Sequence, residues 1–237
     1  MKSKIKSLII LATLIISSKI FASEKDIYEF SWLDPDKEVY VLQNRKFRKA
    51  NHLTLNLGAG LTTSGAFVDS KSFQGRAGYF VSEDYGFEVV YAKNSGKEND
   101  TAVAIRTNNG SNTGGSTPFR RIVDNYFGGM FVWSPFYSKI NTFNKIIYMD
   151  WIFGLGYAQL QETNNKYRVN GTVSDDKDST ETHSGIIWQA GMKFFLTESF
   201  NVRTDLTAVH YQADKALSDG KNWYSNFDAT ISLGYTF

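Results

Sequence analysis

The sequence predicts an all-β fold, namely an eight-stranded antiparallel transmembrane β-barrel with short periplasmic turns and long extracellular loops. Three observations lead to this prediction: an export leader, eight segments in which apolar residues alternate with polar residues or glycine, and connections of two length classes. The composition agrees, because 42% of the 237 residues are hydrophobic, 15% are aromatic and none is cysteine. These values exclude a disordered chain, a disulfide scaffold and a cysteine-based metal or nucleophile site.

The first residues have the layout of a secretory signal peptide. A lysine-rich start is followed by the apolar run 8–16, and the segment ends in Ala22, a small residue suited to signal peptidase. The run is far shorter than the ~20 residues of a membrane-spanning helix. We therefore expect residues 1–22 to be removed on export, leaving a periplasmic N-terminal arm at 23–50 and a barrel at 51–237.

Removal of the leader also changes the charge of the chain. The formal net charge of the full chain is +2. Four of its lysines lie in the leader: Lys2, Lys4, Lys6 and Lys19. Their removal leaves 22 basic residues against 24 acidic ones in the mature chain. A nearly neutral protein lacks the basic surface that nucleic-acid binding requires. No nucleic-acid partner is predicted.

The arm has two candidate roles. It either contacts a partner or caps the barrel mouth, or it is a linker on the bilayer surface. In the second case its aromatic residues rest on lipid and its cations, among them Lys49, meet lipid phosphates.

Eight segments show alternation with a period of two. It is clearest at 53–61, 149–157 and 227–237, and weaker at 73–81, 86–93, 121–133, 185–196 and 201–211. Because successive side chains of a strand point to opposite faces, each segment has one apolar face and one face of polar residues or glycine. Each is close to the ~9–11 residues that a tilted strand needs to cross a bilayer.

The connections decide which face points outward. Alternation alone fits a soluble barrel with an apolar interior as well as a membrane barrel with an apolar exterior. The connections are shorter on one side, at 82–85, 134–145 and 197–200, and longer on the other, at 62–72, 94–120, 160–184 and 212–222. Such asymmetry is typical of outer-membrane barrels. The 134–145 connection is longer than a periplasmic turn should be.

Short motifs add a family resemblance. The chain ends in Phe237 with Leu233 and Tyr235 on the same face, which resembles the signal read by the barrel-assembly machinery. The segments VYVLQNR at 39–45 and WSPFYSK at 133–139 resemble the outer membrane beta-barrel domain family of predatory and social delta-type bacteria. More broadly, the layout is similar to small eight-stranded barrels of the outer-membrane protein A type. The resemblance implies an outer-membrane location, contact with outer-membrane lipid, and assembly machinery and periplasmic chaperones as partners during biogenesis.

The predicted lumen is filled rather than open. Eight strands enclose a space about wide enough for their own side chains, whereas open porins use ~16–18 strands. The inward-facing positions include a candidate network of charged residues: Arg76, Glu88, Asp150, Lys193, Arg203 and Asp205. Counting from a turn at 198–200 predicts that Lys193 lies opposite Asp205 on the neighbouring strand. A general diffusion channel is therefore not expected.

The predicted function is structural, or one of surface interaction through the loops at 94–120 and 160–184. The second interpretation is a narrow channel for small solutes. The third is a lipid-modifying enzyme at the outer rim, where His183, Ser184 and Asp214 are expected to lie near one another.

No flanking motif supports such an enzyme, so no catalytic residue and no cofactor are predicted. The acidic run 175–181 lacks the spacing of a calcium loop, so no metal is predicted either. No feature of the sequence specifies an oligomeric state.

Overall fold

The computed structural model describes residues 45–65, 67–108, 118–142, 145–169, 178–216 and 218–237. The chain divides into two units, Met1–Lys46 and Phe47–Phe237, and the second contains the whole β-sheet. The expected signal peptide and most of the expected arm lie outside the described residues.

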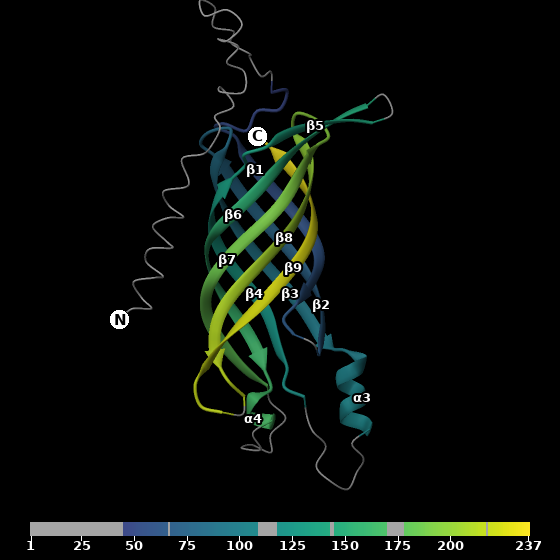
Figure 1. Ribbon diagram of the computed structural model, residues 1–237, viewed down its shortest axis with the longest axis vertical. Helices are drawn as coiled ribbons and strands as arrows, with labels where there is room; N and C mark the ends of the chain where they lie inside the picture. The colour runs from purple at the N-terminus through teal and green to yellow at the C-terminus, as the bar shows by residue number, and fades with distance from the viewer. Residues whose placement is uncertain (1–44, 66, 109–117, 143–144, 170–177, 217) are drawn as a thin grey trace, which may run out of the picture. The chain divides into compact units, whose positions relative to one another are not determined.

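Eight strands close into one antiparallel barrel (Figure 1). In order around the barrel they are β1 (Leu53–Thr63), β2 (Val68–Phe80), β3 (Tyr85–Glu98), β4 (Arg121–Trp133), β6 (Lys145–Asn164), β7 (Ser179–Phe195), β8 (Phe200–Asp214) and β9 (Lys221–Thr236). β9 pairs with β1, and β4 pairs with β6, so the ring of strands is complete. The predicted eight-stranded fold is confirmed.

The apolar face of each strand points outward. Leu57, Leu155 and Leu233 are 75%, 63% and 68% exposed, whereas the inward-facing Asn56 and Ser232 are buried. In water this much exposed apolar surface would mark a binding site or an aggregation hazard. Hydrocarbon accepts such a surface, and a closed barrel pairs its backbone groups internally, as a bilayer requires.

The strands extend further toward the long loops than predicted. β1 and β2 are joined by residues 64–67 alone, so the predicted long loop at 62–72 is wrong. The outward side chains of the β2 extension are polar, for example Asp69 and Lys71, both exposed. Beyond the hydrocarbon a strand needs no apolar face, so the hydrophobic alternation ends before the backbone pairing does. The connections at 99–120 and 165–178 remain long.

Two short helices lie in these long connections. α3 (Asp100–Asn108) follows β3, and its start is capped by Asn99, whose Oδ1 accepts a hydrogen bond of 3.0 Å from the backbone N–H of Ala102. α4 (Lys166–Val169) follows β6. Within the described part of the chain, no helix combines the length and the apolar character needed to cross a membrane.

A ninth strand explains the long connection on the side of the short turns. β5 (Tyr137–Thr142) pairs with the first residues of β6, and the resulting hairpin extends beyond the barrel wall (Figure 1). Ile140 lies opposite Ile147, on the face of β6 that continues to the outward-facing Trp151. The predicted turn at 134–145 is therefore largely a hairpin.

Candidate functional site

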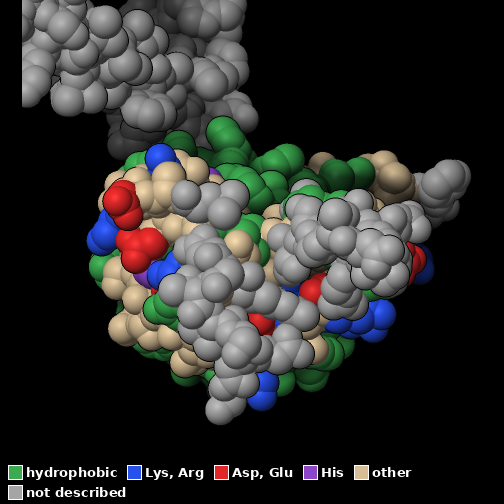
Figure 2. Space-filling view, turned by 90° about the horizontal axis from the view of Figure 1, so that it is seen from below, with side chains coloured by type: hydrophobic (Ala, Val, Ile, Leu, Met, Phe, Trp, Pro, Cys, Tyr) green, Lys and Arg blue, Asp and Glu red, His purple; other side chains and the backbone are tan. Residues whose placement is uncertain are grey.

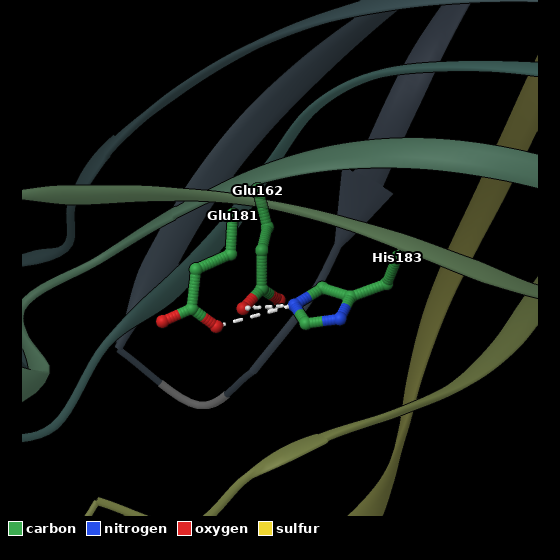
Figure 3. A group of neighbouring side chains, drawn as sticks. All are labelled: Glu162, Glu181 and His183. Carbon is green, nitrogen blue, oxygen red and sulfur yellow. Dashed lines mark hydrogen bonds and ion pairs between the residues drawn. The ribbon is translucent and has the colours of Figure 1, made fainter.

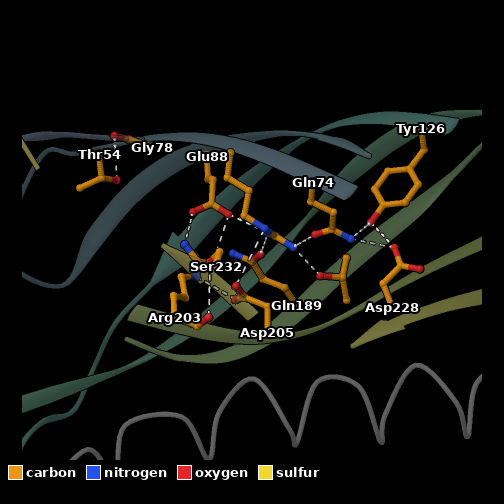
Figure 4. A network of polar contacts seen from close by, with 12 residues as sticks. Thr54, Gln74, Gly78, Glu88, Tyr126, Gln189, Arg203, Asp205, Asp228 and Ser232 are labelled. Atoms are coloured by element: carbon orange, nitrogen blue, oxygen red, sulfur yellow. Dashed lines mark hydrogen bonds and ion pairs between the residues drawn. The ribbon is translucent and has the colours of Figure 1, made fainter. Parts of the chain in front are cut away.

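The interior of the barrel is the candidate site, because most of the predicted site residues face it. From the end with the short turns to the end with the long loops, it holds a group at the periplasmic mouth, a charged network, an apolar cluster and a second charged group. Figure 4 shows the charged network and Figure 3 the group at the other end.

The network is centred on Glu88. Arg76 Nη1 lies 2.9 Å from Glu88 Oε1, and Arg203 Nη1 lies 2.6 Å from Glu88 Oε2 (Figure 4). Arg203 Nε also donates to Asp205 Oδ1 at 2.8 Å. All four residues are at most 4% exposed. Two guanidinium groups and two carboxylates balance in charge, which offsets the large cost of removing each ion from water.

Neutral side chains complete the network. Arg76 donates to Gln189 Oε1, to Gln74 Oε1 at 2.7 Å and to Thr207 Oγ1 at 2.7 Å. Gln74 Nε2 in turn donates to Tyr126 Oη at 2.9 Å. The fork of guanidinium donors thus reaches several strands at once, and hydrogen-bonded networks of this kind stiffen an interior.

Lys193 lies apart from this centre. It faces Arg203 on β8, so the predicted pairing of Lys193 with Asp205 is wrong. The turn between β7 and β8 comprises residues 196–199. Thr197 belongs to this turn, where its Oγ1 accepts a hydrogen bond of 2.9 Å from the backbone N–H of Phe200. Among the described residues, no carboxylate oxygen lies within 4.0 Å of Lys193 Nζ.

Asp150 is instead paired with Lys49, which the sequence reasoning did not place in the lumen. Lys49 Nζ lies 2.7 Å from Asp150 Oδ2 and donates to Ser134 Oγ at 2.6 Å, and Lys49 is 1% exposed. The ring of Phe47 stacks on Phe195 with centroids 4.8 Å apart. Residues 47–49 therefore fill the periplasmic mouth, and Lys49 does not meet lipid phosphates.

The buried positions at 46–49 do not continue the alternation of the first strand. Residues 46–49 alternate between exposed and buried, with Phe47 and Lys49 inside and Lys46 and Arg48 outside. In β1 the odd-numbered residues, such as Leu53, face outward, so the parity reverses between Lys49 and Leu53, where Asn51 has a φ of 62°. Alternation read backward from Leu53 therefore could not place Lys49 in the lumen.

An apolar cluster fills the lumen on the far side of the charged network. Its members face inward from five strands and are each at most 3% exposed: Val90, Ala92, Val123, Tyr126, Met130, Ala158, Leu160, Ile187, Val209, Tyr211 and Ala213. The sequence reasoning missed this cluster because its members often follow another apolar residue, as in Val89–Val90 and Ile186–Ile187. In such pairs alternation does not show which residue is inside.

Glu162, Glu181 and His183 converge at the mouth with the long loops, which is the extracellular one (Figure 3). His183 Nε2 lies 3.3 Å from Glu162 Oε1 and 3.3 Å from Glu181 Oε2. Glu162 is buried, and the other two side chains are partly exposed. Seen from this end, charged side chains of both signs lie at the rim of the barrel (Figure 2).

Each carboxylate of this group has a further partner. Arg121 Nη1 contacts Glu162 Oε1, and Tyr211 Oη donates to Glu162 Oε2 at 2.7 Å. Lys166 Nζ donates to Glu181 Oε1 at 2.9 Å, and this hydrogen bond raises the pKa of Lys166 above its ordinary value. Burial raises the pKa of the Glu181 carboxyl, but the hydrogen bond and charge of Lys166 outweigh it, so this pKa is lowered.

The residues considered for an enzyme are not brought together. Ser184 is exposed on the outer face of β7, whereas its neighbour His183 faces inward. Asp214 pairs with Lys221 at the end of β8, and its carboxylate lies 3.8 Å from Lys166 Nζ. The expected serine, histidine and aspartate set is therefore not formed.

The three C-terminal site residues lie on the outer face. Leu233, Tyr235 and Phe237 are exposed, and the rings of Tyr235 and Phe237 pack edge to face with centroids 4.8 Å apart. The backbone N–H of Phe237 donates to Leu53 O at 2.9 Å, which extends the seam between β9 and β1. Their role in assembly remains a prediction.

Comparison with known proteins identifies the family. Residues 42–237 match the model of the outer membrane protein beta-barrel domain. No curated protein matches the chain.

Several solved structures are similar to the chain. The N-terminal β-barrel domain of OprF from Pseudomonas aeruginosa is 15% identical with a TM-score of 0.47, covering 79% of this chain and 98% of that chain. Neisserial surface protein A is 13% identical with a TM-score of 0.45, covering 78% and 96%. OprG from Pseudomonas aeruginosa is 14% identical with a TM-score of 0.38, covering 82% and 99%.

Proposed function

The chain belongs to the outer membrane protein beta-barrel domain family, and from this premise we propose that it is a sealed structural barrel that presents loops to the outside. The protein is a small outer-membrane barrel whose strands cross the membrane in contact with lipid. The filled lumen is the observation that supports the finer proposal. Packed side chains extend from Phe47 at the periplasmic mouth to Arg121 at the extracellular mouth.

The filling favours a scaffold over a narrow channel. A conducting path needs a continuous column of water, but the Glu88 network and the apolar cluster both lie across the lumen. Opening such a path would separate buried ion pairs and expose apolar side chains to water, and both changes are unfavourable. The proposal also assigns the protein no catalytic role, since His183 and Ser184 face opposite sides of the barrel wall.

The surface part of the proposal rests on the connections at 99–120 and 165–178. Their described parts include α3 and α4, which lie at the extracellular end (Figure 1). A barrel that served only as a membrane filler would function with short connections, as between β1 and β2, where residues 64–67 suffice.

Complementation of a deletion strain tests the proposal. The strain receives the parent protein or a variant in which both long connections are shortened to the length of 64–67, and its sensitivity to detergent is measured. Restoration by both proteins assigns the function to the barrel wall, whereas restoration by the parent alone assigns it to the loops. If the deletion strain is no more sensitive to detergent than the wild type but has lost the uptake of a small solute, the channel interpretation replaces the proposal.

A further inference from the structure

We infer that Glu162, Glu181 and His183 form a binding site for a divalent transition-metal ion at the extracellular mouth of the barrel. Glu162 comes from β6, and Glu181 and His183 come from β7 (Figure 3). Glu181 and His183 are two positions apart on this strand, so both face inward. The site is independent of whether the barrel acts as a scaffold or through its loops.

The distances between the donor atoms fit one ion. His183 Nε2 lies 3.3 Å from Glu162 Oε1 and 3.3 Å from Glu181 Oε2, and the three donor atoms all lie within 4.8 Å of one another. Zinc binds imidazole nitrogen and carboxylate oxygen at about 2.0–2.2 Å in a tetrahedron, which places neighbouring ligand atoms about 3.3–3.5 Å apart. An ion between the three atoms therefore requires a small adjustment of Glu162 and Glu181 and the withdrawal of Arg121 Nη1 from Glu162 Oε1.

The surrounding side chains hold the ligands in this orientation. Tyr211 donates to Glu162 Oε2 at 2.7 Å, and Lys166 donates to Glu181 Oε1 at 2.9 Å. Glu181 is thus fixed through Oε1 while Oε2 points to His183. Glu162 is fixed by Tyr211 through Oε2, and its Oε1 faces both His183 and Arg121 Nη1, so an ion at the site competes with this guanidinium for Oε1. The His183 ring also stacks on Tyr211 with centroids 5.5 Å apart. Partners that orient the ligands in this way are a regular part of protein metal sites.

The mixed donor set selects the kind of metal. Imidazole with carboxylates suits zinc and similar first-row ions, whereas calcium and magnesium prefer six or more oxygen ligands. Arg121 and Lys166 balance the two carboxylates when no metal is bound, and their charges limit the affinity for a divalent ion.

The position of the site suits capture from outside the cell rather than transport. The side chains of His183 and Glu181 are 16% and 19% exposed, so the ion is reached from the extracellular mouth. Three protein ligands leave a fourth position for water or for a ligand group from outside. The apolar cluster below, which includes Tyr211, separates the site from the rest of the lumen.

Titration of the full mature protein without a polyhistidine tag tests the inference. The protein, folded in detergent, is titrated with Co²⁺ while the visible absorption of tetrahedral cobalt is followed, and bound Co²⁺ is then displaced with Zn²⁺. We expect one ion per barrel and at least tenfold weaker binding in His183→Gln and in Glu181→Gln. Glu181 is the preferred carboxylate because Glu162 also holds Arg121 in the lumen.

His210→Gln is the matched control. His210 lies on the outer face, and its ring nitrogens contact Trp188 Nε1 at 2.8 Å and Ser225 Oγ at 2.7 Å, so its removal should leave cobalt binding unchanged. Absence of the tetrahedral absorption, or equal affinity in the parent and in His183→Gln, would overturn the inference. Either result would leave the complementation experiment on the barrel unaffected.

Discussion

Glu88 is the residue on which the charged layer of the lumen depends, because its two oxygens receive Arg76 and Arg203. Glu88→Gln leaves two buried guanidinium groups with one carboxylate fewer. Removing one member of a buried ion pair typically costs about 3–5 kcal/mol. We expect a loss of this size in the free energy of unfolding, measured by urea titration in detergent micelles.

Glu198→Gln is the control for this change, because Glu198 is exposed in the turn between β7 and β8. Its effect should stay within roughly 0.5 kcal/mol, as for most surface substitutions. Equal stability of the two variants would show that Glu88 does not hold the layer together.

Lys49 provides a second test at the scale of one residue. Lys49→Met leaves Asp150 buried without its nearest cation, so we expect a loss of about 3–5 kcal/mol in the same titration. Arg48→Met alters the neighbouring cation, which is exposed, and should change little. If both variants unfold like the parent, Lys49 does not seal the periplasmic mouth.

Single residues also show how far the sequence could predict the site. Alternation alone places Arg76, Glu88, Arg203 and Asp205 inside, because the face of a residue depends only on its parity along the strand. Which of them touch depends on the register between strands, and one turn residue more or less shifts that register. Lys193 was misplaced for this reason, since the turn before β8 includes Thr197.

At the scale of the strand, β6 tests the assignment of faces. Leu155 is 63% exposed and lies between Trp151 and Tyr157 on the lipid side. Leu155→Arg should cost roughly 2–4 kcal/mol if the position is near the bilayer midplane, because arginine is poorly accommodated in hydrocarbon. Refolding into lipid vesicles at a series of denaturant concentrations measures this cost.

Leu196→Arg is the corresponding control, since Leu196 is 62% exposed but lies in a periplasmic turn. Near the interface the same substitution should cost about 0–1 kcal/mol. A negligible cost at Leu155 would mean that the outer face of β6 has been assigned wrongly.

The strands also show where sequence patterns stop being informative. Hydrophobic alternation marks the part of a strand inside the bilayer, so the eight crossings could be predicted while the polar extension of β2 could not. β5 was missed because the hairpin stands outside the barrel wall, where neither face must be apolar throughout. The short turns at 81–84 and 196–199, by contrast, lie close to where the patterning places them.

At the scale of the whole barrel, two layers of different chemistry close the same lumen. In the proposed seal, the Glu88 network opposes the passage of apolar solutes, and the apolar cluster around Met130 and Ile187 opposes the passage of ions and water. Glu88→Gln keeps every side chain of the apolar cluster. The proposed seal therefore predicts a closed barrel even in variants such as Glu88→Gln that weaken the fold.

Planar-bilayer conductance of the purified, tag-free protein tests this central claim most directly. The account predicts a flat current under applied voltage for the parent protein and for Glu88→Gln, with an open porin inserted into the same bilayer as the positive control. Discrete, reproducible unitary openings of the parent protein would contradict a sealed lumen.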